Sequence, residues 1–275
     1  MLRAINIRLY PTKEQEILMN KTFGCCRLVY NLHLAERNKY WEDNKSKPQA
    51  ERSAMVWTTE KHLKEQHPFL KEVSSVALQQ SRIDCDKAFD NWFKSIKGIV
   101  DGNFKHPKFK SKHSNNFSYR EQMVREDAFD FDHRVVLIPK LKEVKFKLRK
   151  HPQFKVLKVK NMTIRKKPSG RYFASILCEV EEFKQAKPMR ESQAYVGLDW
   201  SPKDMFVTSD GLTGKDFGYK ALKQINGLKL HKLQKRLMKK VKGSKNKDKA
   251  RVKVARLEEH TANARKAFTE ASQRL

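Results

Sequence analysis

The sequence has 275 residues, with 60 Lys and Arg against 31 Asp and Glu, and a formal net charge of +29. Hydrophobic residues make up 39% of the chain and include 16 Phe and 4 Trp, so the charge belongs to a folded body and not to a disordered tail. Such a surplus repels itself unless a polyanion neutralises it, and phosphate backbones are the usual partner. No run of about 18 apolar residues predicts a membrane span, and no signal peptide is visible.

The four cysteines carry no metal-binding spacing. Cys25 and Cys26 are adjacent, and Cys85 and Cys178 stand alone, so no CxxC pair is present. We expect buried thiols in a reducing cytoplasm, no zinc site and no catalytic metal site.

The first 97 residues predict one strand followed by helices. Residues 1–10 alternate in the manner of a half-buried strand, and Pro11 ends it. Thr12 to Gln15 reads as a capping box that opens a helix. The helical pattern then continues to about Lys97, with a polar break near Lys45–Gln49.

Residues 98–113 change character. Two glycines, a proline and interleaved Phe and Lys indicate an irregular basic loop. Phe104 and Phe109 are either stacking platforms for bases or anchors of the loop to a core. Five residues of this loop are expected to contact a nucleic-acid backbone: Lys105, Lys108, Phe109, Lys110 and Lys112.

Residues 116–183 predict strands. Residues 129–131 and 135–138 flank a short turn, and residues 163–165 and 171–176 flank the hairpin loop Pro168-Ser169-Gly170. With the strand at the N-terminus, they predict one barrel-like sheet that is interrupted by the helical insertion.

After a polar linker, Lys184–Gln193, an apolar strand leads to Asp199, and a second short strand ends near Thr208. Two helices follow, separated at Lys242–Asn246. The seam between them is expected at Leu230, Leu233, Leu237, Val241, Val254, Leu257, Thr261, Ala264, Phe268, Ala271 and Leu275.

The face opposite this seam is almost uniformly positive. From Lys220 to Arg256 there are 15 Lys and Arg, and the one acidic residue is Asp248. A soluble helical arm normally mixes both signs, so this face is expected to follow phosphates without reading bases. Its predicted backbone contacts are Lys229, Lys232, Lys235, Arg236, Lys239, Lys240, Lys245, Lys249 and Arg251.

Asp199 has two interpretations. It either caps a strand end or is the first carboxylate of a two-metal nuclease, a chemistry that needs several carboxylates around metals about 4 Å apart.

In combination and order, several motifs resemble the TnpB family, transposon-encoded RNA-guided nucleases related to type V CRISPR effectors. They are Tyr10-Pro11-Thr12, Val29-Tyr30-Asn31, Leu78-Gln79-Gln80, Asp86-Lys87-Ala88-Phe89, Pro107–Lys112, Val196-Gly197-Leu198-Asp199, Lys242–Asn246 and Ala262–Lys266. The resemblance covers essentially the whole chain.

The resemblance implies an α+β multidomain fold. A wedge β-barrel (1–10 and 98–190) would be interrupted by a helical recognition domain (11–97). A truncated RNase H-like (RuvC) segment with the basic helical hairpin would follow (194–275).

It also implies a guide RNA and a duplex DNA target as partners, and a bacterial, nucleoid-associated location. A short DNA motif would be read by Gln79 and Gln80, whose amides can pair with adenine in the major groove, with Ser75, Tyr30 and Lys87 as further candidates. Such glutamines can also be simply solvated. Self-association is a further possibility, because an incomplete RNase H-like core leaves edges uncovered.

The family's later catalytic Glu, CxxC pairs and final Asp do not occur in this sequence. One carboxylate cannot hold two Mg²⁺ ions, so the sequence alone predicts a protein that is not an enzyme. Asp199 would then be vestigial, and the chain would bind matched DNA without cutting it and so repress transcription. Two alternatives stay open: the N-terminal part of an active TnpB endonuclease, and a guide-independent basic DNA binder that assists a transposase.

Overall fold

The computed structural model describes residues 1–48, 51, 57–114, 117–122, 128–148, 156–181, 197–199, 207–211 and 219–272. The chain divides into two compact units, the first with residues 1–167 and 171–182 and the second with residues 168–170 and 183–275. The predicted linker Lys184–Gln193 and the end of the predicted seam at Leu275 lie outside the described residues.

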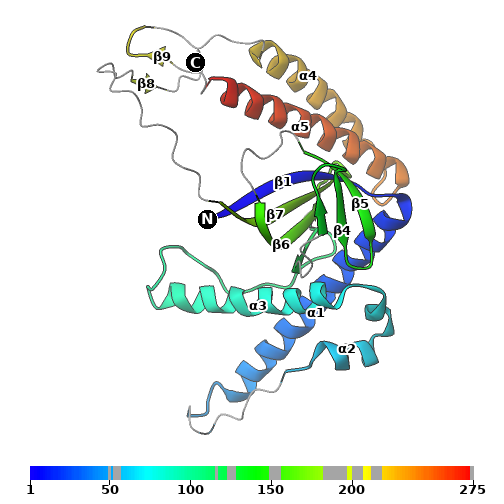
Figure 1. Cartoon of the computed structure of the whole chain (residues 1–275), viewed down its shortest axis with the longest axis vertical. Helices are drawn as coiled ribbons and strands as arrows, with labels where there is room; N and C mark the ends of the chain where they lie inside the picture. The colour runs from blue at the N-terminus through cyan, green and yellow to red at the C-terminus, as the bar shows by residue number, and fades with distance from the viewer. Residues whose placement is uncertain are drawn as a thin grey trace. The chain divides into compact units, whose positions relative to one another are not determined.

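The first unit is built on a curled antiparallel sheet (Figure 1). Its strands are β1 (Leu2–Tyr10), β2 (Phe117–Gln122), β3 (Phe129–Asp130), β4 (Val135–Ile138), β5 (Lys142–Lys147), β6 (Val156–Lys166) and β7 (Tyr172–Val180). They are ordered β2-β6-β7-β1-β5-β4-β3. The first strand of the chain therefore lies in the middle of the sheet, as the barrel hypothesis required.

The sheet is a half-barrel rather than the closed barrel expected from the sequence. Within the described residues its edge strands are β2 and β3, which do not pair with each other. β1 pairs with β7 from Leu2↔Glu179 to Leu9↔Tyr172 and with β5 beside its C-terminal end. Its side chains alternate as predicted, with Ile5, Ile7 and Leu9 buried.

The predicted helical region contains α1 (Lys13–Asn44), α2 (Glu60–Gln66), the short 3₁₀ helix η2 (Pro68–Glu72) and α3 (Ser75–Ile96), which lie to one side of the sheet in Figure 1. The capping box at the start of α1 is confirmed: the Gln15 backbone N–H donates to the Thr12 hydroxyl at 3.3 Å, and the Thr12 N–H donates to the Gln15 amide oxygen at 3.0 Å. α1 ends at Asn44, next to the predicted polar break.

Helices and sheet share one hydrophobic core. The Phe23 ring on α1 lies 5.3 Å from the Tyr119 ring on β2, measured between centroids. The four cysteines are reduced and buried, as expected. Burial raises the pKa of the Cys26 and Cys85 thiols to about 12, so neither is a reactive thiolate near neutral pH.

The second unit has a two-stranded sheet and a helical hairpin. β8 (Leu198–Asp199) pairs with β9 (Val207–Thr208), and Gly211, at φ +78°, turns the chain after β9. α4 (Tyr219–Met238) and α5 (Lys245–Ser272) flank a turn in which Gly243 adopts φ +83°. These residues do not by themselves identify an RNase H-like domain. No helix among the described residues is long and apolar enough to cross a membrane.

Candidate nucleic-acid interface

The loop that follows α3 is irregular, as predicted, and is attached at its first end to α3. The Ser95 hydroxyl donates to the Gly102 carbonyl and accepts from the Phe104 backbone N–H at 3.2 Å. One side chain thus satisfies two backbone groups that a loop would otherwise leave to water.

The other end of the loop is attached to α1. The Asn31 side-chain amide donates to the Lys110 carbonyl at 3.0 Å and accepts from the Lys110 backbone N–H at 2.8 Å. This reciprocal pair holds the backbone of one loop residue as a neighbouring strand would.

Between these two attachments the loop contacts α3 through the ring of His106 and buries Pro107. The His106 ring meets the Phe89 and Trp92 rings edge to face, at 5.3 Å and 4.7 Å between centroids, and Pro107 is buried. Edge-to-face pairs stabilise beyond simple burial, so the middle of the loop is held by rings rather than by backbone pairing.

Both phenylalanines of the loop are exposed. Phe104 is 43% and Phe109 is 59% exposed, so neither ring is buried as a core anchor, and their stacking on bases stays a prediction. Lys105, Lys108 and Lys112 are exposed beside them. The loop therefore presents rings and ammonium groups together.

Lys110 and Tyr30 have a different arrangement from the one expected. Tyr30 is buried, and the Lys110 ammonium lies 3.7 Å from the centroid of its ring. Desolvation lowers the pKa of Lys110, while burial raises the pKa of Tyr30 to about 12. In this structure Tyr30 supports the loop from beneath and presents no ring to a base.

The other candidate motif-reading residues lie along α3. Ser75, Gln79 and Lys87 are exposed, whereas Gln80 is half-buried. Ser75 also accepts a hydrogen bond from the Lys64 ammonium at 2.5 Å, so α2 contributes a cation that the sequence did not single out. Ser75 and Gln79 are four residues apart and share one face of the helix; their role in reading DNA stays a prediction.

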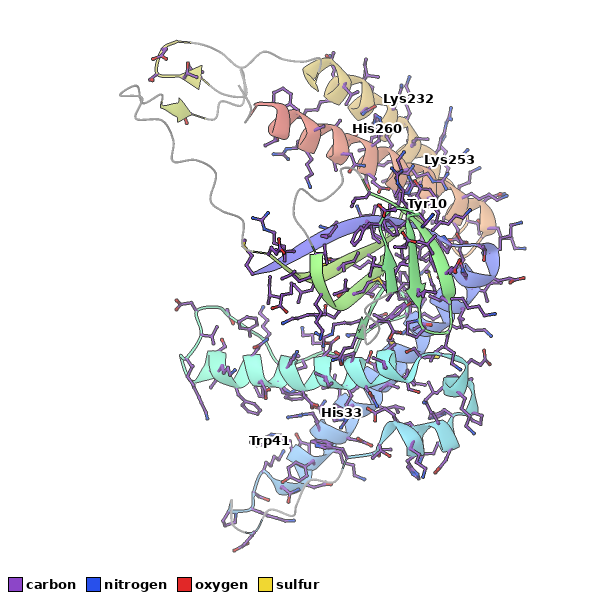
Figure 2. The ribbon with its side chains drawn as sticks, in the orientation of Figure 1. Tyr10, His33, Trp41, Lys232, Lys253 and His260 are labelled. Atoms are coloured by element: carbon purple, nitrogen blue, oxygen red, sulfur yellow. The ribbon has the colours of Figure 1, made fainter. Side chains whose placement is uncertain are left out.

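α1 and α3 are joined by a cluster that sequence reasoning missed. His33 is buried and its Nε2 lies 2.7 Å from Asp86 Oδ1, and Arg37 pairs with the same carboxylate. The Arg37 guanidinium also lies over the Phe89 ring at 4.3 Å. This cluster fixes α3 against α1 and so fixes the two helices from which the loop is held; Figure 2 labels His33 on α1.

A buried carboxylate lies under the start of α3. Glu121 on β2 is 1% exposed, and the Ser74 hydroxyl, which caps α3, donates to its Oε2 at 3.1 Å. Its Oε1 finds no partner among the described residues. Burial raises the pKa of this carboxyl to about 7. The alternation of β2 places this position on the same face as Phe117 and Tyr119, and that spacing is the sequence signal that could have identified it.

The helical hairpin of the second unit is held by a mixed seam. Val254 and Phe268 on α5 are buried as predicted. Val241 is 75% exposed, against expectation, because α4 ends at Met238 and Val241 lies in the turn. The seam instead includes Asn226, which is 6% exposed and donates to the Thr261 hydroxyl at 3.1 Å.

The outer surface of the hairpin is basic. Figure 2 labels Lys232 on α4 and Lys253 on α5. Asp248 lies 3.5 Å from Arg251 in an exposed pair, which neutralises little of the surplus. All the residues predicted to contact phosphates here are exposed: Lys229, Lys232, Lys235, Arg236, Lys239, Lys240, Lys245, Lys249 and Arg251.

Asp199 is exposed and ends β8, where it pairs with Val207. Gly197 supports this strand end, since its carbonyl accepts from the Ser209 N–H at 2.8 Å. Within the part of the chain that the structure describes, no group of three His, Cys, Asp or Glu side chains could hold a metal ion. One carboxylate does not fit a two-metal centre.

The matches to known proteins agree with a nucleic-acid-binding class. A family described as a helix-turn-helix domain matches residues 1–46. In the structure these residues form a strand and one continuous helix, β1 and α1. The match therefore marks common ancestry of this segment and does not describe its local shape.

Two curated relatives align with nearly the whole chain. One, from Streptomyces pristinaespiralis, is named "Putative RNA-guided DNA endonuclease"; it is 30% identical over 97% of this chain and 62% of its own length. A protein of Escherichia coli K12 with the same name and the suffix InsQ is 30% identical over 97% of this chain and 61% of its own length. The virulence protein VsdF of Salmonella dublin is 33% identical over 41% of this chain and 96% of its own length.

The chain belongs to the TnpB family. It spans about three fifths of the length of the two endonuclease relatives. The expectation that it is not an enzyme is wrong, since the relatives aligned over nearly all of it are named as endonucleases. That expectation rested on counting carboxylates in a sequence that spans about three fifths of those relatives.

Proposed function

We propose that this chain is the nucleic-acid-holding part of an RNA-guided DNA endonuclease. It binds a guide RNA and a duplex DNA target, and the RNA selects the DNA by base pairing. Two relatives named as RNA-guided DNA endonucleases support this function.

The observation that carries the proposal is the exposed positive face of the α4–α5 hairpin. Nine Lys and Arg side chains that are predicted to contact phosphates are exposed on it. The one acidic residue in the sequence between the first and the last of them is Asp248. A surface of this kind binds a phosphate backbone by shape and charge and carries no base preference. Sequence selection must then come from another source, and pairing with a bound RNA supplies it.

The other site residues have subordinate roles in this proposal. Ser75 and Gln79 on the exposed side of α3 contact a short DNA motif in the major groove. Where the target lies in a promoter, occupancy alone would also block transcription.

The test is to purify the chain, sequence the RNA that accompanies it, and measure binding to a DNA duplex that matches this RNA. The proposal expects tight binding of the matched duplex, at least tenfold weaker binding of a scrambled duplex, and loss of that preference after RNase treatment. Binding that ignores the match and survives RNase would overturn the proposal and favour a guide-independent basic DNA binder.

A further inference from the structure

The segment from Phe104 to Lys110 is held in one conformation before any ligand arrives. Ser95 fixes the Phe104 backbone N–H at one end, and Asn31 fixes both backbone groups of Lys110 at the other. The His106 ring and buried Pro107 secure the middle. A ligand that binds here does not have to order the loop, which removes a large part of the usual entropic cost.

The side chains that this conformation turns outward form a distinct chemical pattern. Phe109 is 59% exposed and lies in sequence between Lys108 and Lys110, and Lys105 and Lys108 are exposed. Covering this exposed ring with another flat ring removes apolar area from water and adds a favourable stacking contact. The lysines beside it favour a partner that carries both flat apolar groups and negative charge.

We propose that this segment binds an unpaired nucleotide strand, with the Phe109 ring stacked on a base and with Lys105 and Lys108 on the neighbouring phosphates. The proposal rests on the proposed function and deepens it, because it assigns a site for a single strand in addition to the duplex-holding hairpin. Stacking needs an open base face, which a paired helix covers with the next base pair. The site therefore selects unpaired over paired nucleic acid, and it accepts RNA and DNA through their shared chemistry.

The composition around the loop agrees with this occupant. Phe93, near the end of α3, and Phe104 are also exposed, at 40% and 43%. Between residues 87 and 113 the chain has seven lysines and two carboxylates, Asp90 and Asp101. An apolar protein surface would leave these lysines without anionic partners.

The experiment uses the whole chain, freed of bound RNA, with short fluorescent oligo(U), oligo(dT) and a blunt DNA duplex as probes. Phe109→Leu keeps an apolar side chain but removes the flat ring. Since stacking on an aromatic ring contributes about 1–3 kcal/mol per base, we expect at least a fivefold loss of affinity for the single strands, with duplex binding unchanged. Phe109→Trp should retain the single-strand affinity.

The matched control is Phe69→Leu, because Phe69 is a comparably exposed ring, at 47%, on η2 outside the loop. It should change none of the three affinities. Thermal unfolding should be the same for all variants, since both rings are exposed. A loss on either single-stranded polymer supports the site and identifies the polymer that it prefers.

A Phe109→Leu variant that binds both single strands as tightly as the parent chain would overturn the proposal, as would an equal loss on the duplex. A salt titration separates the two kinds of contact. Phe109→Leu should leave the slope of log K against log salt unchanged, whereas Lys108→Ala should reduce its magnitude by about 0.7. These measurements need no guide match, so failure of RNA guidance would be recognised separately.

Discussion

The loop after α3 and the α4–α5 hairpin are both basic, but they are built in opposite ways. The loop has no regular secondary structure, yet hydrogen bonds from Ser95 and Asn31 fix it and leave the Phe109 ring outside. The hairpin is regular, and its exposed groups are mainly long, mobile lysines. Charge on a regular surface is sufficient to hold phosphates, whereas contact with a base requires a ring held in place.

The largest expected effect is on the hairpin. Replacing Lys229, Lys232, Lys235 and Lys239 together by Gln should weaken duplex binding by about two orders of magnitude at low salt. The magnitude of the salt slope should fall by up to about 3.6, because each lost phosphate contact removes about 0.9. Titrations over a range of salt concentrations measure both quantities.

The matched control replaces the same four lysines by Arg, which keeps every charge and should preserve the slope. If the Gln variant kept the parent slope, these lysines would not lie against phosphates, and the contrast between hairpin and loop would be lost.

The next prediction concerns the stability of the first unit, which contains the loop and the buried carboxyl group of Glu121. Because the folded-state pKa of Glu121 is raised to about 7, the folded state favours the protonated carboxyl. The protonated Glu121 carboxyl makes its full contribution to stability below about pH 4.5, and this contribution is lost as the pH rises through about 7. We expect the free energy of unfolding to fall by roughly 2–3 kcal/mol between pH 5 and pH 8.

Glu121→Gln should remove this pH dependence and make the chain more stable than the parent above pH 7. The amide is neutral, like the protonated acid, and its oxygen can still accept the hydrogen bond from Ser74. Denaturant unfolding at several pH values is the measurement. Parallel pH profiles for parent and variant would show that the carboxyl does not control this range.

The smallest effect concerns the attachment of the loop. Asn31→Ala removes the two hydrogen bonds to the Lys110 backbone and should weaken oligo(U) binding about fivefold, equivalent to about 1 kcal/mol. The salt slope should stay the same, because no phosphate contact is deleted. Asn91→Ala, at an exposed position of α3, is the control. A changed slope would mean that Asn31 acts on charge and not on the position of the ring.

Local patterns in the sequence predicted much of the fold. The alternation of β1, the capping box at Thr12 and the Gly and Pro content of the loop each depend on neighbouring residues, and the structure agrees with each. The buried cysteines followed from their lack of metal-binding spacing.

Features that depend on distant packing could not be predicted in this way. Glu121 is buried because the start of α3 covers β2, and Tyr30 is covered because Asn31 draws Lys110 over it. The seam was extended to Val241 because its spacing continued the pattern, but α4 had already ended. Asn226 was missed because a polar residue gives no signal of burial unless its partner, Thr261, is known.

The central place of β1 has a consequence for the synthesis of the protein. Leu2 pairs with Glu179, so β1 is synthesised before the other strands of its sheet and lacks its longest partner, β7, until the last of them has emerged. At about 5–20 residues per second that delay is roughly 10–35 s. During this time a strand with one apolar face and two open edges is exposed to other chains, and its pairing with β7 depends on contacts distant in sequence, which form slowly. Production of the protein should therefore be sensitive to temperature and to the supply of chaperones.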